Sequence, residues 1–386
     1  MSPGLRPGGV IPKVIDMGKG RSGKGTVKRV PVVDARGVPL MPTTPVRARR
    51  MLKEGEAVAR RNKLGIFYIQ LKRAVDPVPK GVQERTQPIA ASVDLGSSFA
   101  GLSVVGTKDT ILNIMTEPVN WVEDALRKRR EMRRLRRYRK CRRRKKRFDN
   151  RKRPEGWVPP STKARWDTYL RIIDHLRKIV PITHVGVEEG KARTKKGQKR
   201  WNNNFSPLQN GRNYFIKELQ KRGLSVTLLP AREVARLRKK HGLTKVKDKA
   251  EKSFYSHCVD AWVISAWITG AATPNCLDIW YAVPLRFHRR QLHGLKPSKG
   301  GVRKRYGGTR SLGFKRGTLV KSGYGLCYIG GFDEKRKRLS LHDVKTGKRT
   351  TKAAKPDDIR VLTSVSFRSF YIPAIPPQAC GTLAGR

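Results

Sequence analysis

Three carboxylates and one histidine stand at spacings that suit the hydrolysis of a phosphodiester. Asp94 and Glu188 each end an apolar run, and His257 precedes Asp260 by three residues. Carboxylate oxygens are the ligands that Mg²⁺ prefers, and in-line attack on a phosphodiester uses two divalent ions roughly 4 Å apart. These residues therefore favour a two-ion centre, with Mg²⁺ as the cofactor and Mn²⁺ as its substitute.

The four side chains would divide this work. Asp94 would bridge both ions from a central strand, while Glu188 and Asp260 would each hold the pair from one side. His257 would orient or deprotonate the attacking water, or contact the scissile phosphate, roles that suit an imidazole. Residues three apart share a helix face, so we expect His257 and Asp260 to reach the same site.

Each of these residues also has an ordinary structural alternative. Asp260 could face solvent from its helix, and His257 could be a hydrogen-bonded core histidine. Composition does not separate Glu188 from Glu189, and strand alternation lets only one of them point toward Asp94. We favour Glu188, which follows the apolar run immediately, and keep Glu189 as the reserve.

The elements that must position these residues follow one another in a definite order. Hydrophobic periodicity predicts strands and helices in turn. They are strands at 89–94, 99–105 and 110–115, a helix at 166–180, a strand at 183–188, a helix at 208–222, a strand at 224–229 and a helix from about Ala250 to Ile268. This is the element order of the RNase H fold, an α/β fold, and it puts each acid at a strand end or on a covering helix.

A very basic helix interrupts this order after the third strand. Between Arg127 and Arg153, 19 of 27 residues are Lys or Arg. At 1.5 Å per residue this helix is about 40 Å long, and it would fray by self-repulsion without a polyanion, so we expect it to lie in nucleic acid. The arginines expected to make contact are Arg129, Arg130, Arg133, Arg134, Arg136, Arg137, Arg139, Arg142, Arg143, Arg144 and Arg147.

The charge of the whole chain points the same way. With 87 Lys+Arg against 29 Asp+Glu, the net charge is +58, which favours phosphate partners through counterion release. No apolar run approaches the roughly 20 residues that span a bilayer, and no signal peptide pattern is visible. The five cysteines form no CxxC pair, which fits a reducing cytoplasm.

Two smaller units flank this core. Residues 30–42 predict a hairpin, followed by a helix capped by Thr43 or Thr44 and a strand at 66–69. After Pro274 the composition shifts to Gly and Arg, and alternating patterns at 317–320, 325–329 and 339–344 predict a small barrel-like β domain. Its candidate nucleic-acid contacts are Arg303, Lys304 and Arg305, with Arg310 beside them.

Together these motifs resemble the split RuvC nuclease of RNA-guided transposon-encoded proteins and their CRISPR effector descendants. Pro39-Leu-Met-Pro42 resembles the PLMP motif of the IscB and IsrB branch. IscB proteins carry an HNH nuclease between the second and third RuvC motifs, but here only 68 residues separate Glu188 from His257, without a His-Asn-His set. Members of the TnpB branch hold a zinc ribbon near their last catalytic motif, whereas this chain has no CxxC pair. The best resemblance is to IsrB, the HNH-less group.

This resemblance implies a guide RNA, called ωRNA, that pairs with one strand of double-stranded target DNA. The single RuvC site would nick the displaced non-target strand next to a short target-adjacent motif, within a monomeric ribonucleoprotein. The implied organisation is a disordered basic tail at 1–30, a PLMP module at 31–80, RuvC part I at 87–118, an arginine-rich bridge helix at 119–153, RuvC part II at 160–230, RuvC part III at 231–273 and a C-terminal domain that contacts the target-adjacent motif at 274–386.

Two other classes of function remain open at this stage. An RNA-independent RNase H-like DNA nuclease, such as a junction resolvase, would share the carboxylates but would not need the arginine helix. A non-catalytic RNA-binding protein would explain the charge but not the spacing of the acids.

Overall fold

The structure is a computed structural model that describes residues 28–75, 87–96, 98–138, 156–189, 207–246, 248, 250–286, 295–296, 301–302, 310–333 and 335–374. Over these residues the chain is a mixed α/β protein with three main sheets, and apolar side chains pack against each of them. Among the described helices, none combines the length and the apolar character needed to cross a membrane.

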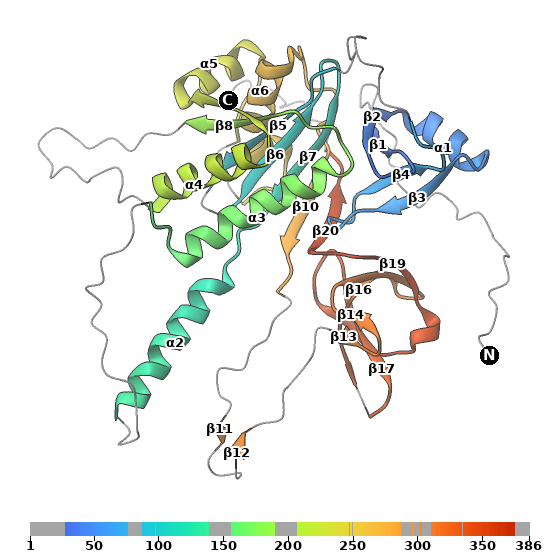
Figure 1. Cartoon of the computed structure of the whole chain (residues 1–386), viewed down its shortest axis with the longest axis vertical. Helices are drawn as coiled ribbons and strands as arrows, with labels where there is room; N and C mark the ends of the chain where they lie inside the picture. The colour runs from blue at the N-terminus through green and yellow to red at the C-terminus, as the bar shows by residue number, and fades with distance from the viewer. Residues whose placement is uncertain are drawn as a thin grey trace, which may run out of the picture.

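A seven-stranded sheet forms the centre of the molecule (Figure 1). The consecutive strands β5 (Ala90–Leu95), β6 (Ala100–Val105) and β7 (Thr110–Thr116) pair antiparallel, which confirms the predicted meander. Beyond β5, the predicted strands β8 (His184–Glu189) and β9 (Ser225–Pro230) extend the sheet in parallel. The full order is β20-β10-β7-β6-β5-β8-β9.

The two remaining strands come from the C-terminal third of the chain. β10 (Ile279–Pro284) pairs parallel with β7, and β20 (Phe367–Ile372) pairs antiparallel with β10. Their buried side chains, Ala282 and Phe367, belong to the same apolar cluster as the central strands. The boundary drawn at residue 274 therefore does not separate a domain, because the chain leaves the central sheet after β10 and returns to it at β20.

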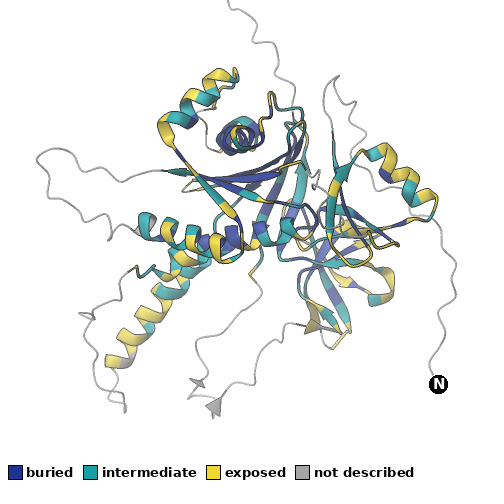
Figure 2. Cartoon of the chain, turned by 45° about the horizontal axis from the view of Figure 1, so that its top comes forward, coloured by how far each residue is buried: buried dark blue, intermediate teal, exposed yellow. Residues whose placement is uncertain are grey.

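Helices cover both faces of this sheet (Figure 2). On one face α3 (Pro160–Arg177) packs against α4 (Pro207–Lys221), and Trp166 and Phe215 join the apolar side chains of the meander. On the other face α6 (Val259–Thr269) lies against β5, β6 and β8, with α5 (Ala231–Lys240) beside it. Nine of the eleven α6 residues are buried, so α6 is a core helix.

The start of α6 differs from the predicted helix at 250–268. Ser253 begins a π-turn, η2 (Phe254–Cys258), through a reciprocal capping box with Ser256, and the α-helix follows only at Val259. The predicted helix therefore begins at Phe254 rather than at Ala250, and its first five residues form a π-turn that runs directly into α6. The turn packs directly on β6, because a Cβ added at Gly101 would meet the carbonyl oxygen of His257.

The N-terminal module is a four-stranded sheet in the order β2-β1-β4-β3 with one helix. Its elements are β1 (Val30–Val33), β2 (Pro39–Thr43), α1 (Pro45–Lys53), β3 (Ala57–Arg61) and β4 (Phe67–Leu71). The hairpin and the Thr44 cap are confirmed, the latter by a bond from Arg47 N to Thr44 Oγ1 of 3.4 Å. Residues 28–30 belong to the folded part, since Arg29 pairs with Asp109 at 2.7 Å, so the predicted tail at 1–30 is too long; residues 1–27 lie outside the described ones.

The C-terminal insertion between β10 and β20 contains a five-stranded antiparallel sheet in the order β18-β17-β16-β15-β19. Its strands are β15 (Thr318–Ser322), β16 (Gly325–Asp333), β17 (Arg338–Asp343), β18 (Arg349–Ala354) and β19 (Arg360–Ser364). The three predicted strands are confirmed. Among the described strands no pairing joins β18 to β19, so this sheet is open rather than a closed barrel.

The basic helix α2 (Trp121–Tyr138) follows β7 and points away from the central sheet (Figure 1). None of its described side chains is buried, and Leu135 and Tyr138 are 53% and 88% exposed. The prediction of a helix here is confirmed up to Tyr138, and residues 139–155 lie outside the described ones. A helix of this charge with so little packing gains its stability from something other than a core.

Candidate active site

Asp94 and Glu188 lie side by side at one edge of the central sheet, where β5 and β8 end. In the parallel pairing of these strands, Val93 lies opposite Val187, and these are the residues immediately before the two acids. Ser265 of α6 donates a hydrogen bond of 2.8 Å to Ser92, so Ser92 points to the α6 face. Because side chains alternate along a strand, Asp94 points to that face as well.

Glu188 shares this face, and Glu189 does not. A Cβ added at Gly186 would come within 2.3 Å of Ile264 in α6, which shows that position 186 faces α6. Position 188 faces the same way and position 189 the opposite way. The structure therefore places Glu188 with Asp94.

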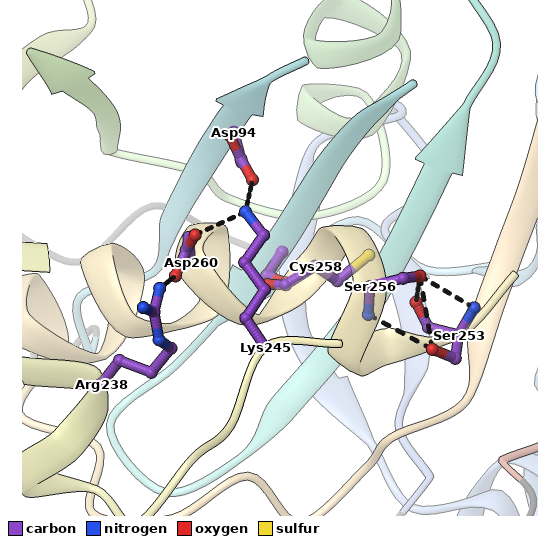
Figure 3. A network of polar contacts seen from close by, with 8 residues as sticks. Asp94, Arg238, Lys245, Ser253, Ser256, Cys258 and Asp260 are labelled. Atoms are coloured by element: carbon purple, nitrogen blue, oxygen red, sulfur yellow. Dashed lines mark hydrogen bonds and ion pairs between the residues drawn. The ribbon is translucent and has the colours of Figure 1, made fainter. Parts of the chain in front are cut away.

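Asp260 reaches the same place from the first turn of α6, and a lysine joins it to Asp94 (Figure 3). Lys245 Nζ donates to Asp94 Oδ2 at 2.8 Å and to Asp260 Oδ2 at 2.6 Å. Arg238, in α5, donates to the other oxygen, Asp260 Oδ1. Only 14% of the Asp94 side chain and 7% of the Asp260 side chain are exposed. Two largely buried acids therefore meet around one ammonium group.

Lys245 lies in a short segment between α5 and η2 whose backbone is held on both sides. Leu243 N donates to Arg238 O at 3.0 Å, and Val246 N donates to Tyr255 O at 3.1 Å. The backbone of Lys245 is thus fixed relative to α6, whereas 34% of its side chain is exposed.

His257 lies beside Asp94 in the π-turn. Its ring centroid is 5.0 Å from that of Phe99, and the residue is 8% exposed. A Cβ added at Gly101, the β6 partner of Asp94, would come within 1.8 Å of the carbonyl oxygen of His257. Gly101 thus allows the turn to approach the sheet closely. His257 stands in the π-turn and Asp260 in the first turn of α6, and the two turns follow one another without a break; π-turns of this kind are frequent at functional sites.

The acids of this centre act on one another electrostatically. Burial raises the pKa of Asp94, and the carboxylate of Asp260 adds to the rise, whereas Lys245 and His257 oppose it. Burial also raises the pKa of Glu188, with contributions from Asp94 and Asp260. For Lys245, burial acts to lower the pKa, but the two aspartates outweigh it and the pKa is raised. The three carboxylates therefore form one electrostatic unit.

The donor set fits a divalent cation. Three carboxylates supply the hard oxygen ligands that Mg²⁺ requires, and a bound cation would relieve the repulsion that adds to the effect of burial on the pKa values of Asp94 and Glu188. Within the described part of the chain, no three acidic, histidine or cysteine side chains already lie close enough to form a metal-binding group. Lys245 lies between two of the acids, so a cation that bridges Asp94 and Asp260 requires the lysine to leave them.

The predicted nucleic-acid contacts divide into described and undescribed residues. Of the arginines predicted to make contact, those with exposed side chains on α2 are Arg129, Arg130, Arg133, Arg134 and Arg137, and Arg136 belongs to the same helix. Those outside the described residues are Arg139, Arg142, Arg143, Arg144, Arg147, Arg303, Lys304 and Arg305. The described part of α2 thus offers at least five exposed guanidinium groups apart from the carboxylate centre.

Sequence reasoning missed three residues of this centre. Lys245 and Arg238 carry no distinguishing signal, because they are two cations among 87 in the chain. Gly101 did carry one, since an isolated glycine inside a strand marks a close approach of another backbone.

The described residues thus define a mixed α/β protein with a carboxylate centre at an edge of its main sheet and a separate basic helix. Residues 30–205, which include Asp94 and Glu188, match the model of the family described as RRXRR protein. The pattern Arg-Arg-Leu-Arg-Arg occurs in α2 at residues 133–137.

No curated protein matches the chain. Among solved structures, T. thermophilus RuvC in complex with a Holliday junction substrate is similar, with 16% identity over 48% of this chain and 99% of that chain and a TM-score of 0.26. The fold described above rests on the strand order and not on that likeness.

Proposed function

We propose that this chain is an RNA-guided DNA endonuclease that nicks one strand with a single Mg²⁺-dependent centre on an RNase H-like core. The observation that carries the proposal is that Asp94 and Asp260 share the ammonium of Lys245, while Glu188 lies on the same face of the sheet as Asp94 and feels the charge of both aspartates. Burying like charges together is costly, so such a cluster favours catalysis over structure. The order of a meander followed by alternating helices and strands supports the RNase H-like core.

In this proposal each side chain has a defined role. Asp94, Glu188 and Asp260 would hold the divalent ions. Bound ions would supply Lewis-acid activation of water and stabilisation of the leaving oxygen. His257, with its ring packed on Phe99 beside Asp94, would accept the proton of the attacking water.

The guide RNA is proposed from α2 and the charge of the chain. The exposed arginines of α2 have no core to cover and would lie against RNA and its heteroduplex with DNA, which proteins of this kind recognise by backbone and shape. The five-stranded C-terminal sheet would contact the target-adjacent motif. One centre cuts one strand, so we propose a nick in the displaced strand by a monomeric ribonucleoprotein, in line with the IsrB resemblance.

The test uses the chain produced in cells together with its flanking DNA. The complex is washed in high salt, its RNA is sequenced, and a supercoiled plasmid that matches the RNA is added with Mg²⁺. We expect a discrete RNA and an open-circular product. Asp94→Ala, Glu188→Ala and Asp260→Ala should each abolish nicking while RNA and DNA binding persist, and Glu189→Ala should nick normally.

Each other outcome points to another class of function. Cleavage without a discrete RNA would indicate an RNA-independent nuclease of the junction-resolvase type. Bound RNA without Asp94-dependent cleavage would indicate a non-catalytic RNA-binding protein. Linear product at low enzyme excess would indicate a second nuclease centre.

A further inference from the structure

The ammonium group of Lys245 lies where it competes directly with a cation for two of the three carboxylates. Its Nζ is 2.8 Å from Asp94 Oδ2 and 2.6 Å from Asp260 Oδ2. A cation that bound both acids would need the carboxylates that the ammonium already contacts, and the positive charges of the cation and the ammonium would repel each other. Lys245 and a bridging divalent cation therefore exclude each other.

Asp260 is held on its other side as well. Arg238 donates to Asp260 Oδ1, and its side chain is 24% exposed. Arg238 comes from α5 and Lys245 from the segment that follows, and Leu243 N bonds back to Arg238 O between them. One stretch of chain thus presents two cations to Asp260, and one of them, Lys245, also contacts Asp94.

We propose that Lys245 is a positioning residue of the carboxylate centre, whose ammonium holds Asp94 and Asp260 together until a divalent cation displaces it. This inference rests on the proposed function, because it assumes that the acids bind a divalent cation. Its consequence is that the chain's own lysine sets the metal affinity of the centre. Loading then frees the Lys245 side chain at the solvent-facing side of the site.

The experiment measures metal binding rather than activity. Mn²⁺ is titrated into the full-length chain with its copurified RNA, and free Mn²⁺ is followed by electron paramagnetic resonance. An Asp94→Asn chain, prepared identically, measures the Mn²⁺ that binds to RNA and to other sites. Subtracting this amount from the Mn²⁺ bound by the unaltered chain gives the binding at the carboxylate centre. Lys245→Met should bind Mn²⁺ at the centre at least about tenfold more tightly than the unaltered chain, since a unit charge a few ångströms from the ligand oxygens is removed.

Two further chains control for loss of charge and loss of fold. Lys239→Met removes an exposed lysine of α5 and should leave the Mn²⁺ affinity unchanged. Lys245→Arg keeps the charge and should bind Mn²⁺ no more tightly than the unaltered chain. Thermal unfolding adds a second readout: Lys245→Met should unfold at a lower temperature in EDTA, and saturating Mn²⁺ should remove the deficit.

The results separate this inference from the proposed function. Equal or weaker Mn²⁺ binding by Lys245→Met, together with a stability deficit that Mn²⁺ does not remove, would show that Lys245 is only structural. Absence of Asp94-dependent binding in every chain, Lys245→Met included, would remove the metal centre itself and both proposals with it.

Discussion

The closest backbone approach at the centre supports a prediction for Gly101→Ala. Gly101 pairs with Asp94 across β5 and β6, and an added Cβ would lie 1.8 Å from the carbonyl oxygen of His257, whereas ordinary contact begins at 3.4 Å. The strand and the turn must separate by about 1.6 Å. Because β6 is paired on both sides, the turn that carries His257 must move. Overpacking of this kind costs about 3 kcal/mol, and a misplacement above 1 Å slows catalysis about a hundredfold.

Gly106→Ala is the matched control, because Gly106 directly follows the same strand and an added Cβ there would meet its nearest atom at 3.8 Å. Thermal unfolding and plasmid nicking are measured on both variants. Gly101→Ala should unfold about 4 °C lower than the unaltered chain and nick about a hundred times more slowly, while Gly106→Ala should match the unaltered chain in both. Equal behaviour of the two variants would refute the idea that Gly101 sets the place of the π-turn.

Three further predictions follow from other contacts. Asn113→Ala should lower the free energy of unfolding by roughly 2–4 kcal/mol in urea titrations, because the buried amide of Asn113 donates to the carbonyls of Cys276 and Asp278. In EDTA, the Glu188→Gln variant should become more stable relative to the unaltered chain as the pH rises above 4.5. Because the pKa of Glu188 is raised in the folded state, the stability that its protonated carboxyl group contributes is present below pH 4.5 and is lost as the pH rises through that raised pKa. Replacing Arg133 and Arg134 by Gln should weaken RNA binding and reduce the slope of log K against log salt by about 1–2 in filter binding.

Two of the three acids of the centre could be placed from sequence because each lies at the end of a strand that the sequence predicts. Asp94 and Glu188 follow apolar runs whose strands form as predicted, and the parallel pairing of those strands brings the acids together. The sequence does not show which of Glu188 and Glu189 points to the same side of the sheet as Asp94. The packing of α6 against Gly186 shows that it is Glu188. Local pattern gave the strand, and tertiary packing gave the face.

The elements that sequence reasoning missed depend on contacts between distant parts of the chain. The π-turn at 254–258 forms where its backbone packs against Gly101, and the helical pattern of the sequence does not indicate this contact. β10 and β20 are six residues long, like most strands of the central sheet, but they lie after Pro274, where the composition of the chain has already changed. Lys245 contacts an acid 151 positions away in the chain, and nothing near it in the sequence marks that contact.

The choice of lysine at position 245 has a physical rationale in so basic a chain. With 87 basic and 29 acidic residues, any cluster of acids that a cation must reach will attract the chain's own cations first. Arginine would hold two carboxylates through a planar fork of donors, whereas lysine is a point charge on a flexible stem. A centre that must exchange an internal cation for a divalent one therefore favours lysine between Asp94 and Asp260 and leaves arginine, at position 238, on the outer oxygen.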